Sequence, residues 1–149
     1  CTSKVSFDLF CGTGTITQTL AQSAKTAVGV ELVEEAVEAA KVNAELNGLD
    51  NCQFIAGDVF QVLDQIEEKP DVISGDPPRM GILDKAVDKI MQYEVEQIIY
   101  ISCNPKTLAI NLARMQEHGY RVKSYKAFDN FANTKHVEAA VLLTRNKTM

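Results

Sequence analysis

The sequence has no run of about 18 consecutive apolar residues, which is the length that a membrane-spanning helix needs. It also lacks the basic and then apolar start that is typical of a signal peptide. Hydrophobic residues make up 46% of its 149 residues and charged residues 23%, as in ordinary soluble globular proteins. We therefore expect residues 1–149 to form one compact domain.

Cysteines are few and show no metal-binding pattern. Cys1, Cys11, Cys52 and Cys103 form no C-x-x-C pair and have no histidine close by in the sequence. No metal site is expected from this pattern, and a disulfide framework is improbable in a domain of this size. Free thiols indicate a reducing compartment, which predicts a cytoplasmic location.

Positive charge is also scarce, with 15 basic against 20 acidic residues and a net charge of −5. This balance argues against a domain that binds nucleic acid by itself. The charge is uneven, because residues 119–149 hold 6 basic and 2 acidic residues. A charged polymer would more easily meet this end, or a further domain.

Since the chain starts with Cys and becomes strand-like within five residues, we expect the C-terminal catalytic part of a longer protein.

Apolar runs and helical spacing alternate along the chain. They predict strands at 4–10, 25–32, 51–58, 70–79 and 97–104, and helices at 15–24, 33–49, 59–68, 83–94 and 105–120. The longest expected helix has four apolar residues near one face: Val37, Ala40, Ala44 and Leu46. Two final strands, 121–131 and 136–145, are separated by a short connection. The pattern predicts an α/β fold with a mainly parallel sheet and an antiparallel C-terminal edge pair.

A glycine turn follows the first expected strand, in the stretch "DLFCGTGTIT". Gly12 and Gly14 permit a tight turn and a close approach of the backbone to a ligand. Glu31 ends the second strand, 17 residues beyond Gly14, where its carboxylate can accept hydrogen bonds from both hydroxyls of a ribose. The third glycine of a dinucleotide fingerprint is replaced by Thr17, so this signal is weak by itself.

Two further carboxylates stand where later strands end, and ligands collect at that edge of a parallel sheet. Asp58 can receive an adenine amino group, and Asp76 can face the charged amino-acid part of S-adenosylmethionine. Three acids suit this cationic cofactor better than a pyrophosphate, which they would repel. The alternative is that Glu31 and Asp58 only cap the helices that follow them.

The stretch "IIYISCNPKTLA" places Cys103 at the mouth of a strand, just before a helix that Pro105 opens. A structural cysteine would more naturally lie inside the apolar run, whereas a nucleophile would lie here. The alternative is a small buried apolar residue. Cys11 is the rival nucleophile, but its place inside the glycine turn favours a packing role.

Five motifs occur in order: "DLFCGTGTIT", "VGVE", "GDPPR", "YISCNPKTL" and "KHVEAAVLL". Together they resemble the catalytic domain of RNA 5-methyluridine methyltransferases, which methylate uracil C5 in 23S ribosomal RNA and transfer RNA. The resemblance implies a class I methyltransferase fold, a Rossmann-like three-layer sandwich, with S-adenosylmethionine as cofactor. It also implies an RNA substrate, with 23S ribosomal RNA as the first candidate and transfer RNA as the second, and an RNA-binding domain elsewhere in the same chain. The residues that it places at the cofactor are Phe10, Thr15, Glu31, Asp58 and Asp76.

The same resemblance implies that Cys103 is the nucleophile and Glu138 the base. A thiolate that adds to uracil C6 makes C5 nucleophilic, and a base must then remove the C5 proton. The positive end of the helix that Pro105 opens should favour the thiolate. His136 is the alternative base, and Asn104 could hold either the uracil edge or the loop.

Other residues keep two interpretations. Arg79 could contact RNA phosphate or brace its loop, and Phe128 and Phe131 could pack on a flipped base or fill the core. A set of lysines could steer RNA or form a solvated face: Lys106, Lys123, Lys126 and Lys135. The rival functions are a methyltransferase with another acceptor and an isolated cofactor-binding domain that is inactive without its RNA-binding module.

Overall fold

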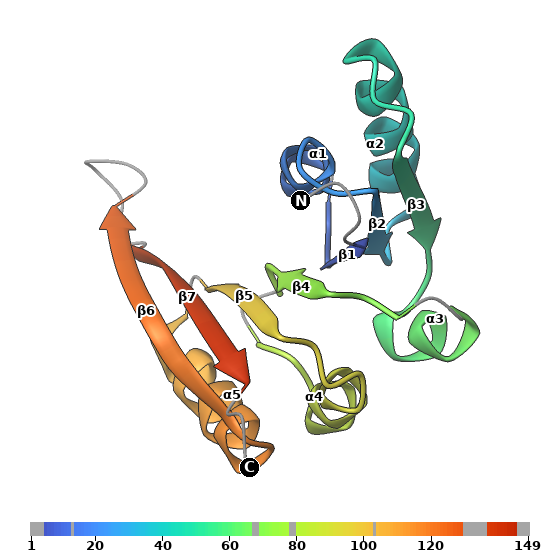
Figure 1. The fold of residues 1–149 in the computed structure, drawn as a ribbon. Coiled ribbons are helices and arrows are strands. Elements are labelled where there is room, and N and C mark those ends of the chain that lie inside the picture. Colours follow the sequence, from blue (N-terminus) through green and yellow to red (C-terminus); the bar gives the residue numbers. More distant parts are fainter. Residues whose placement is uncertain are drawn as a thin grey trace. The chain divides into compact units, whose positions relative to one another are not determined.

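The computed structural model describes residues 5–12, 14–66, 69–77, 80–102, 104–129 and 137–145. Contacts within the chain divide it into two compact units, Cys1–Gly75 and Asp76–Met149 (Figure 1). Over the residues just named, no helix is long and apolar enough to cross a membrane. That residues 1–149 form a single domain stays a prediction.

The first unit alternates strands and helices. Its elements are β1 (Val5–Leu9), α1 (Thr15–Ala21), β2 (Thr26–Glu31), α2 (Glu34–Leu46), β3 (Cys52–Ala56), α3 (Val59–Gln65) and β4 (Val72–Gly75). The four strands pair in parallel in the order β3-β2-β1-β4. Parallel pairing requires a crossover between successive strands, and the three helices provide these crossovers.

The helices of the first unit lie on both faces of its strands. Figure 1 shows α1 and α2 on one side and α3 on the other. This follows from right-handed crossovers, because the chain moves outward from β1 to β3 and then returns to β4. The central strand β1 is buried on both faces: Phe7 and Leu9 on one face, and Ser6 and Asp8 on the other, are all at most 4% exposed.

Helix α2 confirms most of its expected apolar face. Val37, Ala40 and Ala44 are buried and pack with Phe54 of β3. The prediction for Leu46 is wrong, because its side chain is 77% exposed. Successive residues of an α-helix are rotated by about 100°, so Leu46 lies about 200° around the axis from Ala44 and points away from the sheet.

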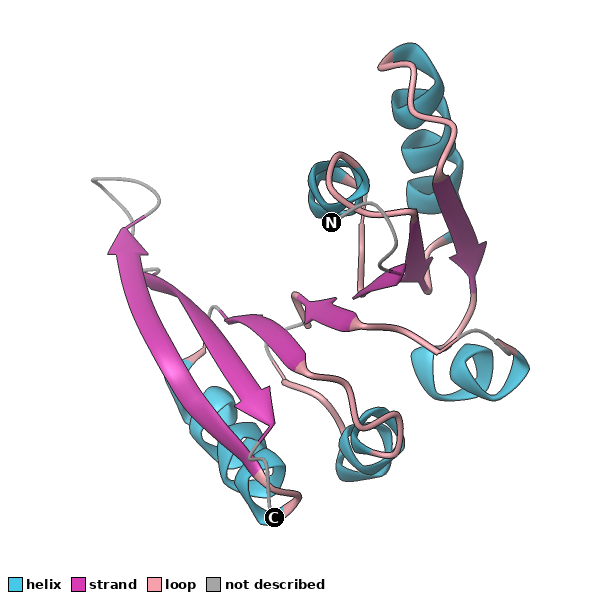
Figure 2. Cartoon of the chain, in the orientation of Figure 1, coloured by secondary structure: helices cyan, strands magenta, loops and turns pink. Residues whose placement is uncertain are grey.

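In its described residues, the second unit combines antiparallel strands with helices (Figure 2). Its elements are α4 (Asp84–Met91), β5 (Gln97–Ser102), α5 (Pro105–Glu117), β6 (Tyr120–Asp129) and β7 (Val137–Arg145). The central strand β7 pairs with β5 on one side and β6 on the other, antiparallel in both cases. The expected antiparallel C-terminal pair, β6 and β7, is confirmed. The parallel strands of the first unit complete the expected α/β class.

One buried amide ties the second unit together. The side-chain oxygen of Asn111, on α5, accepts a hydrogen bond from the main-chain N–H of Ile82 (2.9 Å), and its side-chain nitrogen donates one to the main-chain carbonyl of Ile82 (2.8 Å). The same Asn111 oxygen also accepts a hydrogen bond from the Tyr100 hydroxyl of β5. The side chain therefore joins the helix to the strand beneath it and to the segment before α4. Such fully satisfied buried groups fix one packing arrangement.

Candidate functional site

The glycine turn after β1 has an unusual backbone. Phe10, Gly12 and Gly14 all have positive φ, at 60°, 56° and 87°. The turn is fixed by hydrogen bonds from Cys11 N to the Val30 carbonyl and from Gly14 N to the Cys11 carbonyl, each 2.9 Å. Positive φ at a bulky residue such as Phe10 is rare, and such strain concentrates at functional sites.

The two glycines have different reasons to be glycine. A Cβ at Gly14 would lie 2.9 Å from Phe54 Cε1 and 3.0 Å from the Ala40 Cβ. At Gly12 a Cβ would meet nothing within 4 Å. Gly14 thus allows α1 to begin close to the apolar cluster. At position 12, the positive φ is the feature that favours glycine, and the space beside the turn is open.

Glu31, the last residue of β2, is held by main-chain donors. One carboxylate oxygen accepts from Gly12 N and the other from Val33 N, each at 3.0 Å. The first bond joins Glu31 to the glycine turn, which a simple helix cap would not do. A carboxylate offers about four acceptor positions, so both oxygens can still accept from a ligand.

Asp58 lies beside Glu31, because Gly57 N donates to the main-chain carbonyl of Glu31 at 2.9 Å. The Asp58 side chain caps α3 and accepts from Phe60 N (2.9 Å) and Gln61 N (3.3 Å) through one oxygen, Oδ1. The capping alternative is therefore a real contact for this residue. Since Asp58 is also exposed, capping does not exclude a second, ligand-binding role.

For two further expected cofactor residues, Asp76 and Thr15, the structure gives the position in the fold. Asp76 is exposed and directly follows Gly75, the last residue of β4. Thr15 is the first residue of α1. Their roles at the cofactor stay predictions, as do those of the other five expected residues.

The rival nucleophile, Cys11, lies in the setting of a packing residue. It packs against the cluster around Val37 and Phe54, and it donates a weak hydrogen bond to the Gly12 carbonyl (Sγ···O, 3.7 Å). Burial, followed by the negative charges of Asp8 and Glu31, raises the pKa of the Cys11 thiol to about 12. Such a thiol stays protonated near pH 7 and is a poor nucleophile.

Cys103 itself lies outside the described residues, but the residues on both sides of it are held firmly. Asn104 N donates to the Ser102 hydroxyl (3.1 Å), and that hydroxyl donates to the Asn104 carbonyl (3.0 Å). The Asn104 side chain caps α5 by accepting from Lys106 N at 3.1 Å. Of the two expected roles for Asn104, holding the loop is the one that these contacts show.

Glu138 is described only by its main chain, in β7 opposite Phe128. Its neighbour Ala139 pairs with Ser102, the residue before Cys103 in the sequence. His136, Arg79, Lys135 and Phe131 lie outside the described residues, as does the side chain of Phe128. The choice between Glu138 and His136 as base stays a prediction.

The sequence-based predictions did not include Asp8, a buried carboxylate next to the glycine turn. Asp8 of β1 is 1% exposed and accepts hydrogen bonds from the Thr17 hydroxyl (2.6 Å) and the Ser74 hydroxyl (3.1 Å). These bonds join β1 to α1 and β4 around the turn. The signal was present in the sequence, because an acid stands within the apolar run "VSFDLF".

Most of the chain matches a known protein family. A family model described as tRNA (uracil-5-)-methyltransferase matches residues 3–146. A curated relative from Clostridium tetani, named "uncharacterized RNA methyltransferase", is 50% identical over 147 residues, which are 99% of this chain and 32% of the relative. Another from Caldanaerobacter subterraneus, also named as an RNA methyltransferase, is 51% identical over 97% of this chain and 32% of its own. The chain thus spans about a third of the length of these relatives.

A solved structure is also similar over most of the chain. It is a Pyrococcus abyssi tRNA (uracil-54, C5)-methyltransferase in complex with S-adenosyl-L-homocysteine, with a TM-score of 0.84 and 30% identity. The match covers 95% of this chain and 34% of that one. It confirms the expected class I methyltransferase fold and S-adenosylmethionine as the cofactor of the family. From the family model and these relatives, the chain belongs to the tRNA (uracil-5-)-methyltransferase family.

Proposed function

We propose that the protein methylates C5 of uracil in RNA and takes the methyl group from S-adenosylmethionine. Membership of the family supports the reaction class. The observation that carries the proposal for this chain is the register of β5 and β7, in which Ser102 pairs with Ala139. The residue after Ser102 is Cys103, and the residue before Ala139 is Glu138.

The register supports a nucleophile and a base that act on one ring. Consecutive Cα atoms are about 3.8 Å apart, so Cys103 and Glu138 each lie one short step from the Ser102–Ala139 pair. Because the strands are antiparallel, both steps lead toward the same end of the pair. The thiol and the carboxylate can then approach the same pyrimidine.

The two residues divide the chemistry between them. The Cys103 thiolate adds to uracil C6, and the electron pair of the C5–C6 double bond makes C5 nucleophilic. When bound, S-adenosylmethionine would supply an electrophilic methyl group for C5, and its sulfonium–methyl bond would break to leave S-adenosylhomocysteine. Glu138 then takes the C5 proton, the double bond re-forms, and the sulfur–C6 bond breaks to release the thiolate.

Helix α5 supports a reactive thiolate at Cys103. It begins at Pro105, runs for 13 residues, and its first turn contains no acidic side chain. The N-terminus of such a helix carries a partial positive charge, which stabilises a nearby anion. We expect this charge to favour the thiolate form of Cys103.

The cofactor is assigned to the turn and the strand ends. The residues proposed to hold it are Phe10, Gly12, Gly14, Thr15, Glu31, Asp58 and Asp76. The open side of Gly12, next to the fixed carboxylate of Glu31, fits a ribose with two hydroxyl donors. The acids at this edge also complement the positive sulfonium and ammonium groups.

We propose 23S ribosomal RNA as the acceptor, with transfer RNA as the second candidate. The second is favoured by the Pyrococcus abyssi protein, which is described as acting on uracil 54 of tRNA. Because the chain spans about a third of its relatives, we propose that another domain of the same protein provides part of the RNA-binding surface.

The test is to digest RNA from cells that lack this protein and map 5-methyluridine by mass spectrometry. We expect one or more sites in 23S ribosomal RNA to lose the modification and to regain it when the full-length gene is restored. Loss in transfer RNA would select the second candidate. If every 5-methyluridine remains, the proposal is wrong, and an acceptor of another kind is indicated.

A further inference from the structure

Strand β6 is an exposed edge with an unusual charge. It stands at the end of the strand order of its unit and pairs with β7 on one side. Residues 121–127 are all exposed. They include Arg121, Lys123 and Lys126 and no acidic residue, although the whole chain has a net charge of −5. Within the described part of the chain, no ion pair involves these three cations.

The register places this edge close to the proposed catalytic pair. Ser102, Ala139 and Ala127 lie in one row across β5, β7 and β6, and Lys126 belongs to the next row, opposite Ala140. Neighbouring strands are about 4.8 Å apart, so the main chain of Ala127 lies roughly 10 Å from Ser102. Arg121 lies in the row of Thr144 and Gln97, about 17 Å further along the strands. Lys126 is therefore placed for a nucleotide next to the target, and Arg121 for one several nucleotides away.

The side chains of β6 present cations along one face. Directly paired residues of antiparallel strands point to the same side. Lys126 therefore shares a side with Ala140, and Arg121 shares that side with Thr144. Lys123 sits at the irregularity between Val122 and Ser124. The neighbouring Tyr125, on the other side, is 61% exposed and offers an aromatic surface.

We propose that β6 binds the phosphates of the RNA nucleotides that flank the target, through Arg121 and Lys126. The proposal rests on the proposed function and adds the surface that holds the substrate. Lys and Arg neutralise phosphates and release condensed counterions, which favours binding without reading the base sequence.

A structural role for the same residues makes a different prediction. Charged side chains on an exposed edge strand prevent it from pairing with another molecule. A glutamate would serve this purpose as well as a lysine, because either sign repels a copy of itself. Charge reversal therefore separates the two roles.

The experiment uses the full-length protein with the double substitution Arg121→Glu and Lys126→Glu. With target RNA, we expect KM for RNA to rise about tenfold or more at moderate salt, and its salt dependence to weaken by roughly 1.5 to 2 in log–log slope. The kcat and the Kd for S-adenosylmethionine should not change. Lys126→Arg should keep the wild-type KM, because it keeps the charge.

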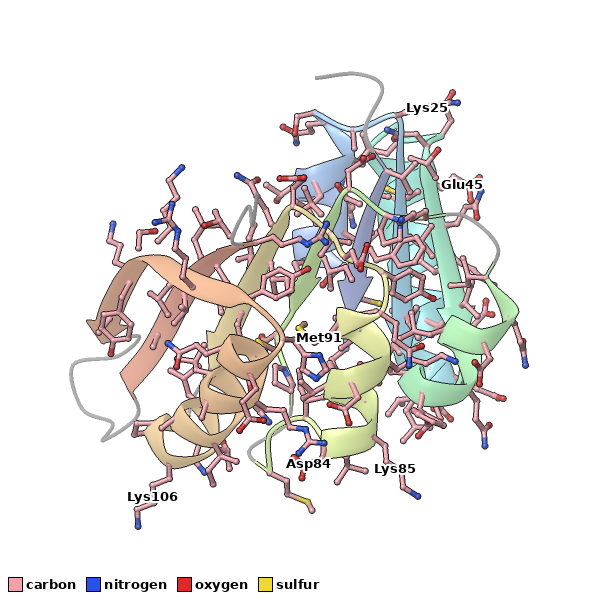
Figure 3. All side chains as sticks on the ribbon, turned by 60° about the horizontal axis from the view of Figure 1, so that its bottom comes forward. Lys25, Glu45, Asp84, Lys85, Met91 and Lys106 are labelled. Carbon is pink, nitrogen blue, oxygen red and sulfur yellow. The ribbon has the colours of Figure 1, made fainter. Side chains whose placement is uncertain are left out.

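The double substitution Lys25→Glu and Lys85→Glu is the matched control, since it also reverses two exposed cations and both lie outside β6 (Figure 3). Equal KM values for the β6 double variant and this control would overturn the proposal and leave edge protection as the role of β6. The Tm of each variant checks that it is folded.

Filter binding of RNA separates this proposal from the proposed function. Wild-type protein that binds RNA through β6 but forms no 5-methyluridine would contradict only the function.

Discussion

The two units of the chain hold their functional groups by different means. In the first, the carboxylates of Glu31 and Asp58 stand at the ends of parallel strands and are fixed by main-chain N–H donors. In the second, an antiparallel register and a capped helix fix the residues on both sides of Cys103. We therefore predict that binding of the cofactor and chemistry on the RNA depend on separate parts of the chain, and that substitutions separate them.

The largest effect is expected for Cys103→Ala in the full-length protein. Methylation of target RNA should fall by roughly 10⁴-fold or more, because removing a nucleophile removes the covalent route. Calorimetry should show an unchanged Kd for S-adenosylmethionine, since the first unit holds most of the proposed cofactor residues.

Cys52→Ala is a suitable control, because Cys52 is a partly buried thiol of the first unit that packs on its core cluster. It should keep its turnover when assayed below its Tm. If the Cys103→Ala protein keeps its turnover while the control behaves as expected, the assignment of the nucleophile is wrong.

The second effect is on the stability of one unit. Asn111→Ala leaves the main chain of Ile82 and the Tyr100 hydroxyl without the amide that they contact. We expect the free energy of unfolding to fall by about 3 kcal/mol, measured by urea denaturation. Ile110→Ala, at a 63% exposed neighbour, should change it by less than about 0.5 kcal/mol.

Hydrogen exchange on the Asn111→Ala protein tests the division into units. Faster exchange confined to α4, α5 and β5 would show that the second unit opens by itself. If β1 and β2 exchange faster by the same factor, the chain unfolds as one cooperative domain, as expected from its length.

A pair of substitutions at Asp58 should produce a smaller effect and divide its two roles. Asn is as good a helix cap as Asp, whereas Ala is poor, so Asp58→Ala should cost about 1 kcal/mol of stability and Asp58→Asn much less. If Asp58 also binds the cofactor by its charge, both variants should weaken S-adenosylmethionine binding by about tenfold. Wild-type affinity in Asp58→Asn would reduce this residue to a cap.

The smallest effect concerns acid stability. Asp88 of α4 accepts hydrogen bonds from Arg114 Nε (2.9 Å) and Nη2 (2.7 Å) and contacts His118 Nε2 (3.0 Å). The bond from Arg114 and then that from His118 lower the pKa of the Asp88 carboxyl from 3.8 to about 2. A lowered pKa stabilises the folded state above the ordinary value, and this contribution is lost as pH falls from 3.8 through 2.

The Tm difference between wild type and Asp88→Asn is the readout for this ion pair. It should shrink as the pH falls from 4 to 2. Because the pair is partly accessible to solvent, the difference should also shrink in high salt. A difference that grows as the pH falls would contradict the assignment.

The sequence predicted the strands and helices well, because apolar runs and helical spacing report burial directly. It failed for Leu46, where the end of an apolar stretch lies beyond the buried stripe of α2. It did not reveal the pairing of Ser102 with Ala139, since register depends on packing between distant segments. Nor could it show that Asp58 caps α3 while Glu31 is joined to Gly12, because ligand-binding and capping acids look alike in a sequence.

The central claim is that a Cys103 thiolate bonds to C6 of the target uracil. The most direct measurement is the intact mass of the full-length protein after incubation with S-adenosylmethionine and RNA that carries 5-fluorouridine at the target. Fluorine cannot leave C5 as a proton, so we predict a stable protein–RNA adduct, with peptide mapping that places the modified nucleotide on Cys103. An adduct on another residue, or an equal yield from Cys103→Ala, would contradict the account.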